Sequence, residues 1–258
     1  MSPAPALQTR NLVKRFGGFT ATSDVSLSLA AGARHALIGP NGAGKTTLIH
    51  LLSGYLEPSA GQVLLDGRDV TRLAQHQRVA RGLARTFQIN SLFPDLSVLE
   101  SVVMAVAQRR GLGARLWRAV GSHAQAVDEA AELLQTLGLL DVARRPAREL
   151  AYGRQRLLEI ALALALRPRV LLLDEPAAGV PAAESRELFE ILAQLPRSIT
   201  IVLIEHDMDL VFRFAERISV LVGGALLADG DPRAIAADPR VRQVYLGEQT
   251  TPGVPAHA

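Results

Sequence analysis

The sequence predicts an α/β protein built on a parallel sheet, and two observations carry that prediction. Two continuous apolar runs, 170–173 and 199–204, are typical of strands covered on both faces, and segments with helical periodicity lie before and after the first run. A glycine-rich loop at 39–47 joins a predicted strand at 33–38 to a predicted helix at 47–52 that ends at Gly54. Strands that alternate with helices favour a parallel sheet.

The remaining elements follow from the same patterns in chain order. Residues 7–13, 24–30 and 61–65 alternate in polarity and are expected to be strands. Helical spacing then extends from Ser97 to about Leu140, which predicts a helical insertion in the α/β core. Helices are expected at 155–166, apolar on nearly all sides, and at 182–195, and a closing hairpin is expected at 220–228.

Composition narrows the functional classes. The 258 residues suit one large domain or a core domain with an insertion, and 48% of them are apolar. The absence of cysteine excludes disulfides, zinc–thiolate sites and thiol nucleophiles. Neither a signal peptide nor an apolar run of spanning length is evident, so we expect a cytoplasmic chain.

The net charge is only +3, but arginines gather in two groups. We interpret these groups as solvated helix faces or as contacts with an anionic membrane surface or partner. Nucleic acid is not an expected partner, because no basic run is interleaved with aromatic residues. The two groups are Arg109, Arg110, Arg115 and Arg118, and Arg144, Arg145 and Arg148.

The glycine-rich loop matches the phosphate-binding pattern G-x-x-x-x-G-K-[ST] in the strand–loop–helix context that the pattern requires. Its backbone N–H groups and the following helix N-terminus are expected to bind phosphate oxygens. Lys45 is expected to reach the β- and γ-phosphates, and the Thr46 hydroxyl to bind Mg²⁺. A glycine turn that only joins strand to helix is the alternative. The loop comprises Gly39, Pro40, Asn41, Gly42, Ala43, Gly44, Lys45, Thr46 and Thr47.

Polar residues follow two of the predicted strands directly. Because ligands of parallel sheets lie at the carboxyl ends of strands, these residues are expected to meet the glycine loop. Asp174 is the expected Mg²⁺ carboxylate and Glu175 the expected general base, while His206 is expected to contact the γ-phosphate. Phe16, before the Gly17-Gly18 turn, is a stacking platform for a nucleobase or an ordinary packing residue.

With these motifs in order, the chain resembles the ATP-binding cassette (ABC) ATPases over about residues 7–247. Gly39–Thr47 corresponds to the Walker A loop, 171–176 to Walker B and His206 to the switch histidine. Phe16 falls at the adenine-stacking position, and Gln88 corresponds to the glutamine that contacts the metal and couples to the membrane partner. The signature motif corresponds to Leu150, Ala151, Tyr152, Gly153, Arg154 and Gln155.

The resemblance implies an ABC-type P-loop ATPase core with a parallel sheet, an antiparallel β-subdomain and a helical subdomain inserted between Gln88 and the signature. It implies one domain over 7–247, with a core at 7–90 and 155–247 and a helical subdomain at about 91–154. Residues 248–258 are expected to be a disordered tail.

Five segments resemble one branch of this family: Arg-Thr-Phe-Gln at 85–88, Leu-Ala-Tyr-Gly at 150–153, Asp-Glu-Pro-Ala-Ala-Gly at 174–179, Ile-Glu-His-Asp-Met at 204–208 and Val-Tyr-Leu-Gly-Glu at 244–248. On these segments the chain is similar to the branch that imports branched-chain amino acids. The resemblance implies ATP and Mg²⁺ as ligands, with ATP held between one subunit's Walker A loop and the other's signature. The implied partners are a second ABC ATPase subunit, identical or not, a transmembrane permease at the inner face of the membrane and, indirectly, a periplasmic or extracellular solute-binding protein.

Alternatives stay open at this point. Urea, amides, aromatic acids or other amino acids are possible transported solutes, and a soluble ABC protein of translation or DNA repair is a disfavoured reading. Two departures from the family pattern, Ala151 in place of a serine and Pro181 in the loop after Walker B, raise a third hypothesis. It is a nucleotide-dependent scaffold with weakened hydrolysis.

Overall fold

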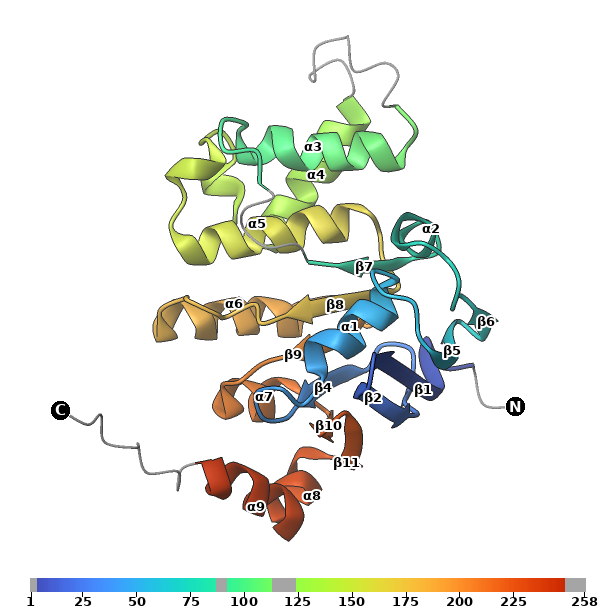
Figure 1. Ribbon diagram of the computed structural model, residues 1–258. Helices are drawn as coiled ribbons and strands as arrows, with labels where there is room; N and C mark the ends of the chain where they lie inside the picture. Colours follow the sequence, from blue (N-terminus) through green and yellow to red (C-terminus); the bar gives the residue numbers. More distant parts are fainter. Residues whose placement is uncertain (1–3, 87–91, 113–123, 249–258) are drawn as a thin grey trace, which may run out of the picture.

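The computed structural model describes residues 4–86, 92–112 and 124–248 and arranges them around two sheets (Figure 1). The larger sheet has the strand order β11-β10-β4-β9-β8-β7, and every neighbouring pair except β10–β11 is parallel. The predicted parallel sheet is therefore confirmed. Its strands are β4 (Arg34–Ile38), β7 (Leu83–Arg85), β8 (Val170–Asp174), β9 (Thr200–Ile204), β10 (Arg217–Val222) and β11 (Ala225–Gly230).

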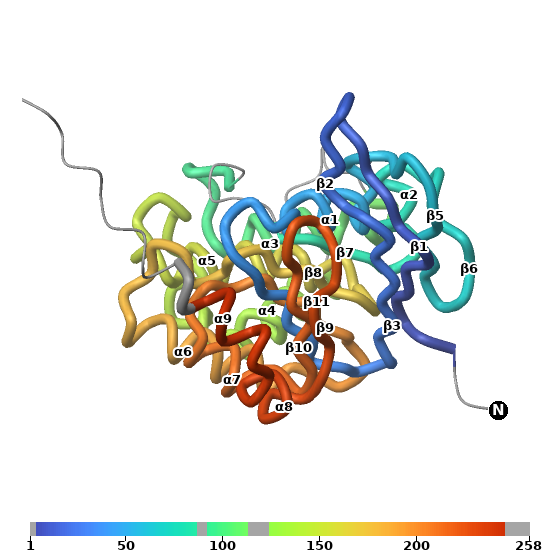
Figure 2. Tube along the Cα trace, turned by 60° about the horizontal axis from the view of Figure 1, so that its bottom comes forward, coloured from blue at the N-terminus to red at the C-terminus, as the bar shows by residue number. Residues whose placement is uncertain are grey.

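The smaller sheet is antiparallel and has the order β2-β1-β5-β6, with β3 also paired to β1. Figure 2 shows β2 beside the turn between β10 and β11, where the Ser23 N–H donates to the Gly224 carbonyl at 2.7 Å. The two sheets thus meet at this turn. The strands are β1 (Leu7–Phe16), β2 (Phe19–Val25), β3 (Ser28–Leu29), β5 (Ala60–Leu65) and β6 (Arg68–Asp69).

The single strand predicted at 24–30 is wrong, because the chain forms β2 and β3 with a break between them. Asn11 and Asp24 both have left-handed backbone conformations, with φ of 47° and 54°, and the Asn11 amide donates to the Asp24 carboxylate at 2.7 Å. Asp24 lies where β2 has one extra residue relative to β1, between the Leu12–Val25 and Lys14–Thr22 pairs. β2 then ends at Val25, and the chain pairs with β1 again as the short β3.

The helices lie around the larger sheet, with one group beyond each of its two edges. In Figure 1 the block of α3 and α4 lies beyond α5 at the β7 edge, and α8 and α9 lie at the β11 edge. The α3 start matches the predicted change to helix at Ser97, which forms a capping box with Glu100. The helices are α1 (Lys45–Ser53), α2 (Gln75–Val79), α3 (Val98–Arg109), α4 (Ala124–Thr136), α5 (Tyr152–Ala165), α6 (Ala182–Gln194), α7 (Met208–Phe214), α8 (Pro232–Ala237) and α9 (Pro239–Glu248), with 3₁₀ turns at Leu140–Val142 and Ala147–Glu149.

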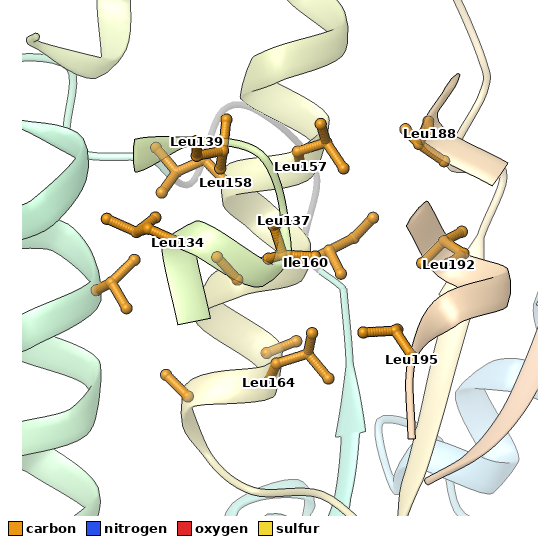
Figure 3. Close-up of a cluster of buried hydrophobic side chains, with 14 of the residues drawn as sticks. Leu134, Leu137, Leu139, Leu157, Leu158, Ile160, Leu164, Leu188, Leu192 and Leu195 are labelled. Carbon is orange, nitrogen blue, oxygen red and sulfur yellow. The ribbon is translucent and has the colours of Figure 1, made fainter. Parts of the chain in front are cut away.

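The largest apolar cluster packs the helices onto the β7–β8 side of the sheet (Figure 3). Leu134 of α4, Leu158 of α5 and Leu192 of α6 are fully buried in it. The helix predicted at 155–166 begins three residues earlier, at Tyr152, and its apolar sides are buried as expected. A second cluster packs α1 between the two sheets, which fixes the helix that follows the glycine loop.

His35 makes the unfolding free energy depend on pH, with lower stability at lower pH. Its ring is buried with Nε2 2.8 Å from the Ser219 hydroxyl, and burial lowers its pKa from 6.5 to about 4. A histidine with a lowered pKa stabilises the fold when neutral, so this stabilisation is complete above pH 6.5 and is lost as the pH falls toward 4. We expect it to account for about 2 kcal/mol of the unfolding free energy between pH 7.5 and pH 5.

The test is the difference in unfolding free energy between wild type and His35→Gln, measured by urea denaturation at both pH values. A difference is needed because burial raises the pKa of Glu159 to about 7, and that carboxyl acts in the opposite direction over the same range. A His35→Gln difference that does not change with pH contradicts the expectation.

Candidate functional site

The glycine loop follows β4 and is packed so closely that side chains are excluded at two of its glycines. A Cβ at Gly39 would lie 2.1 Å from the Leu221 carbonyl oxygen, and one at Gly44 would lie 2.4 Å from the Ala21 carbonyl oxygen. The Gly224 N–H of the β10–β11 turn also donates to the Ala43 carbonyl at 3.0 Å. Both sheets therefore hold the loop in place, and α1 begins directly after Gly44.

Lys45 and Thr46 take different positions at the start of α1. The Lys45 side chain is buried, and its Nζ donates to the Gly39 and Pro40 carbonyls at 2.6 and 2.9 Å. Its ammonium group therefore lies within the loop, on the side where a bound phosphate chain would need positive charge. Thr46 is exposed and faces a pocket.

This pocket, of about 590 Å³, brings together residues from separate parts of the sequence. It collects Thr46 from α1 and both acidic residues, Asp174 and Glu175, from the end of β8. The hydroxyl and carboxylate oxygens present here are the ligand types that Mg²⁺ prefers, so Thr46 and Asp174 fit such an ion. The other lining residues are His50, Tyr55, Gln75, Arg85, Thr86, Arg156 and Ala178.

Arg85 is a residue of this pocket to which the sequence analysis gave no role. Its guanidinium donates to the Asp174 carboxylate at 2.7 Å, and each side chain is about one-fifth exposed. The contact arises because β7, which ends at Arg85, is the parallel neighbour of β8. Arg85 therefore neutralises the carboxylate that we expect to hold a metal ion. The sequence signal that could have pointed to Arg85 is its position at the end of a short strand, three residues before Gln88.

Glu175 and His206 are in direct contact. His206 Nε2 lies 2.5 Å from Glu175 Oε1, and both side chains are more than one-third exposed. Glu175 has a left-handed backbone with φ of 50°, a rare conformation for a residue with a side chain. Its N–H nonetheless pairs with the Ile204 carbonyl at 2.9 Å, which ties the ends of β8 and β9 together. The predicted meeting of these two strand ends is found.

Glu205 is the second residue that sequence analysis missed, and it binds the backbone at His206 and at Ala177, two residues after Glu175. Its carboxylate is 4% exposed; one oxygen accepts from the Ala177 N–H at 2.8 Å and the other from the His206 N–H at 2.9 Å. Burial raises its pKa, and the negative charge of Glu175 adds to the effect. A charged residue directly after an apolar strand was the signal that could have found it.

We expect Glu205→Gln to lower ATP turnover about tenfold, because an amide has only one oxygen and turns N–H donors toward one of the two backbone N–H groups. The KM for ATP should change little, since Glu205 does not line the phosphate loop. Protonation removes the same acceptor, so wild-type turnover should fall as the pH falls through the raised pKa of Glu205. Steady-state kinetics beside the exposed variant Glu190→Gln tests this, and equal turnover in the two variants contradicts it.

The signature residues of the same chain lie apart from this pocket. Ala151 and Tyr152 are exposed at the start of α5, and Leu150, Ala151 and Arg154 line a different hollow with Asp141 and Arg145. Leu150 is itself buried, and Gln155 donates to its carbonyl at 3.0 Å. One described chain therefore presents the phosphate loop and the signature as two separate surfaces.

Two further candidates are less well placed. Phe16 is 47% exposed and is not among the residues that line the pocket; the Lys14 ammonium lies 5.1 Å from its ring centroid. It is therefore accessible at the end of β1 for stacking. Gln88 lies outside the described residues.

Comparisons with known proteins give consistent results over most of the chain. The model of the ABC transporter family matches residues 22–178, and that of the branched-chain amino acid ATP-binding cassette transporter matches residues 225–250. The chain is similar to the high-affinity branched-chain amino acid transport ATP-binding protein LivG of Escherichia coli K12, with 42% identity covering 95% of this chain and 98% of LivG.

Solved structures of ATP-binding cassettes have the same fold. The crystal structure of an ABC transporter cassette in its ADP conformation matches with a TM-score of 0.84 and 31% identity, covering 94% of this chain and 99% of that chain. A dimeric cassette in a post-hydrolysis state, bound to ADP and Pi, matches with a TM-score of 0.73 and 25% identity, covering 88% and 99%. The predicted fold class is confirmed.

Proposed function

We propose that this chain, which belongs to the ABC transporter family, is the ATP-hydrolysing subunit of an importer for branched-chain or related amino acids. The observation that carries the proposal is the single pocket that gathers Thr46, Asp174 and Glu175, with His206 against Glu175. The similarity to LivG and the match at residues 225–250 support the amino-acid branch.

The residues of the chain have separate tasks in this function. The amides of the loop 39–47 and the Lys45 ammonium bind the phosphates, and Phe16 stacks on the adenine. Thr46 and Asp174, with Gln88, would hold Mg²⁺, which would neutralise negative charge on the phosphates. Glu175 accepts a proton from the attacking water, and His206 orients Glu175 and contacts the γ-phosphate. Arg85, which donates to Asp174 in the separate chain, would compete with the ion for that carboxylate.

The complete site lies between two subunits. In the separate chain the signature residues Leu150, Ala151 and Arg154 line a different hollow from the pocket beside the phosphate loop, and a relative of the same fold is a dimer bound to ADP and Pi. ATP therefore favours a closed dimer in which each signature meets the other subunit's loop, and hydrolysis reopens it. The Gly153 N–H and the positive end of α5 serve the γ-phosphate where Ala151 lacks a hydroxyl.

The dimer drives a transmembrane permease from the inner face of the membrane, with a solute-binding protein delivering the solute. No helix among residues 4–86, 92–112 and 124–248 is long and apolar enough to cross a membrane. An exposed aromatic residue, Phe93, precedes α3 of the helical block, which favours this edge for the permease. We assign the core to 7–90 and 155–247 and the helical subdomain to about 91–154. Of the tail predicted at 248–258, Glu248 is the last residue of α9, and the rest lies outside the described residues.

Uptake of labelled solutes by cells lacking this gene tests the proposal. Leucine, isoleucine and valine uptake should fall and should be restored by wild type but not by Glu175→Gln. Urea, amides and aromatic acids are measured in parallel. Loss of one of those uptakes, with leucine uptake intact, assigns the subunit to another solute; unchanged uptake of all of them contradicts a transport role for this chain.

A further inference from the structure

A carboxylate of the same chain binds the signature motif. Glu184, in the first turn of α6, accepts a hydrogen bond at its Oε2 from the Gly153 N–H at 3.2 Å. A Cβ at position 153 would lie 2.4 Å from that oxygen, so only glycine permits this approach. The contact joins residues 31 positions apart and is partly buried.

The chemistry of the α5 N-terminus explains the attraction. The first N–H groups of a helix lack partners within the helix and carry partial positive charge. Ala151, at the N-cap, has no side chain that accepts a hydrogen bond, and the first turn of α5 holds no acidic residue. Glu184 therefore supplies from another helix the negative acceptor that α5 lacks.

We propose that Glu184 is a further residue of the composite nucleotide site, where it competes with the γ-phosphate for the Gly153 N–H. In the separate subunit the carboxylate holds this donor, and the γ-phosphate bound to the partner subunit displaces it as the dimer closes. Hydrolysis converts the γ-phosphate to inorganic phosphate, and once that phosphate leaves, Glu184 regains the donor and favours reopening. The inference rests on the proposed function, because it requires the signature to meet a phosphate.

Two contacts near Glu184 join the start of α5 to the segment that follows Glu175. Release of Glu184 therefore affects that segment. The Tyr152 ring lies against Gly179, where a Cβ would be 3.3 Å from it. Arg156 donates to the Tyr152 hydroxyl at 3.2 Å and to the Ala178 carbonyl at 3.5 Å. The start of α5 is thus joined to the segment 178–184, which follows Glu175 in the chain.

ATP-driven dimerisation tests the competition. Light scattering during an ATP titration is recorded for Glu175→Gln alone and combined with Glu184→Ala, Glu184→Gln or the exposed control Glu187→Gln. We expect Glu184→Ala to lower the ATP concentration for half-maximal dimerisation about fivefold, Glu184→Gln to lower it less, and the control to leave it unchanged. An unchanged or higher ATP requirement in Glu184→Ala overturns the proposal.

A second measurement separates this inference from the proposed function. Amide hydrogen exchange at Gly153 is followed by NMR in the nucleotide-free chain with and without Glu184→Ala. We expect exchange to be several-fold faster in the variant, because the acceptor is lost. Equal exchange rates overturn the inference, whether or not dimers form. If Glu175→Gln alone does not dimerise with ATP while exchange at Gly153 does change, the composite site fails and the contact itself stands.

Discussion

Glu175→Gln is expected to lower ATP turnover by about two to three orders of magnitude while ATP binding is retained. The loss has this size because general-base catalysis contributes roughly 10²–10⁴ to a rate, and glutamine accepts no proton from water. The substitution keeps the shape of the side chain and its reach to His206, which lies 2.5 Å from the carboxylate. ATP binding should persist because the phosphate contacts come from the loop and Lys45.

Phosphate release and binding of labelled ATP are measured side by side for wild type, Glu175→Gln and the exposed control Glu190→Gln. The control should match wild type in both assays. Turnover in Glu175→Gln equal to that of wild type removes Glu175 from the role of base. Wild-type turnover close to background favours the nucleotide-dependent scaffold that Ala151 and Pro181 suggest.

Arg78→Met is expected to lower the free energy of unfolding by about 3 kcal/mol, since it leaves several buried carbonyls without donors. The Arg78 guanidinium is 1% exposed, and burial lowers its pKa to about 10. It donates to the Leu51 and Leu52 carbonyls at 2.6 and 2.7 Å, at the C-terminal end of α1. Two more bonds reach the Thr71 and Leu73 carbonyls.

The substitution therefore affects the helix whose other end carries Lys45. Methionine matches much of the arginine stem but has no donor, so the effect isolates the lost hydrogen bonds. Urea denaturation is compared with Arg81→Met, an exposed arginine three residues further on, which we expect to change stability by no more than about 0.5 kcal/mol. Equal stabilities of the two variants show that α1 does not depend on Arg78.

Local sequence patterns predicted the elements that position the phosphate site. The glycine loop, the apolar runs before Asp174 and Glu205, and the helical spacing after Ser97 each involve residues close in sequence. Their positions at the carboxyl ends of parallel strands then followed from a general rule of α/β sheets. For this reason the pocket could be predicted before any contact was known.

The missed features depend on pairs of residues far apart in sequence. The Arg85–Asp174 and Glu184–Gly153 contacts join residues 89 and 31 positions apart, and local sequence does not show which distant partner each residue contacts. Directly before the break between β2 and β3, a left-handed Asp24 accepts a hydrogen bond from Asn11 on the neighbouring strand. Alternation in polarity contains no information about such a break, so one strand was predicted where two form.

The most direct test of the composite site is cross-linking between two chains, which the absence of native cysteine makes specific. In the Glu175→Gln background, one chain carries Asn41→Cys in the phosphate loop, and a second chain, distinguished by size, carries Ala151→Cys at the signature. We predict a disulfide that joins the two chains in the presence of ATP and that fails to form without nucleotide. The absence of that cross-linked dimer under ATP, or formation of the disulfide within a single chain carrying both substitutions, contradicts a site shared between subunits.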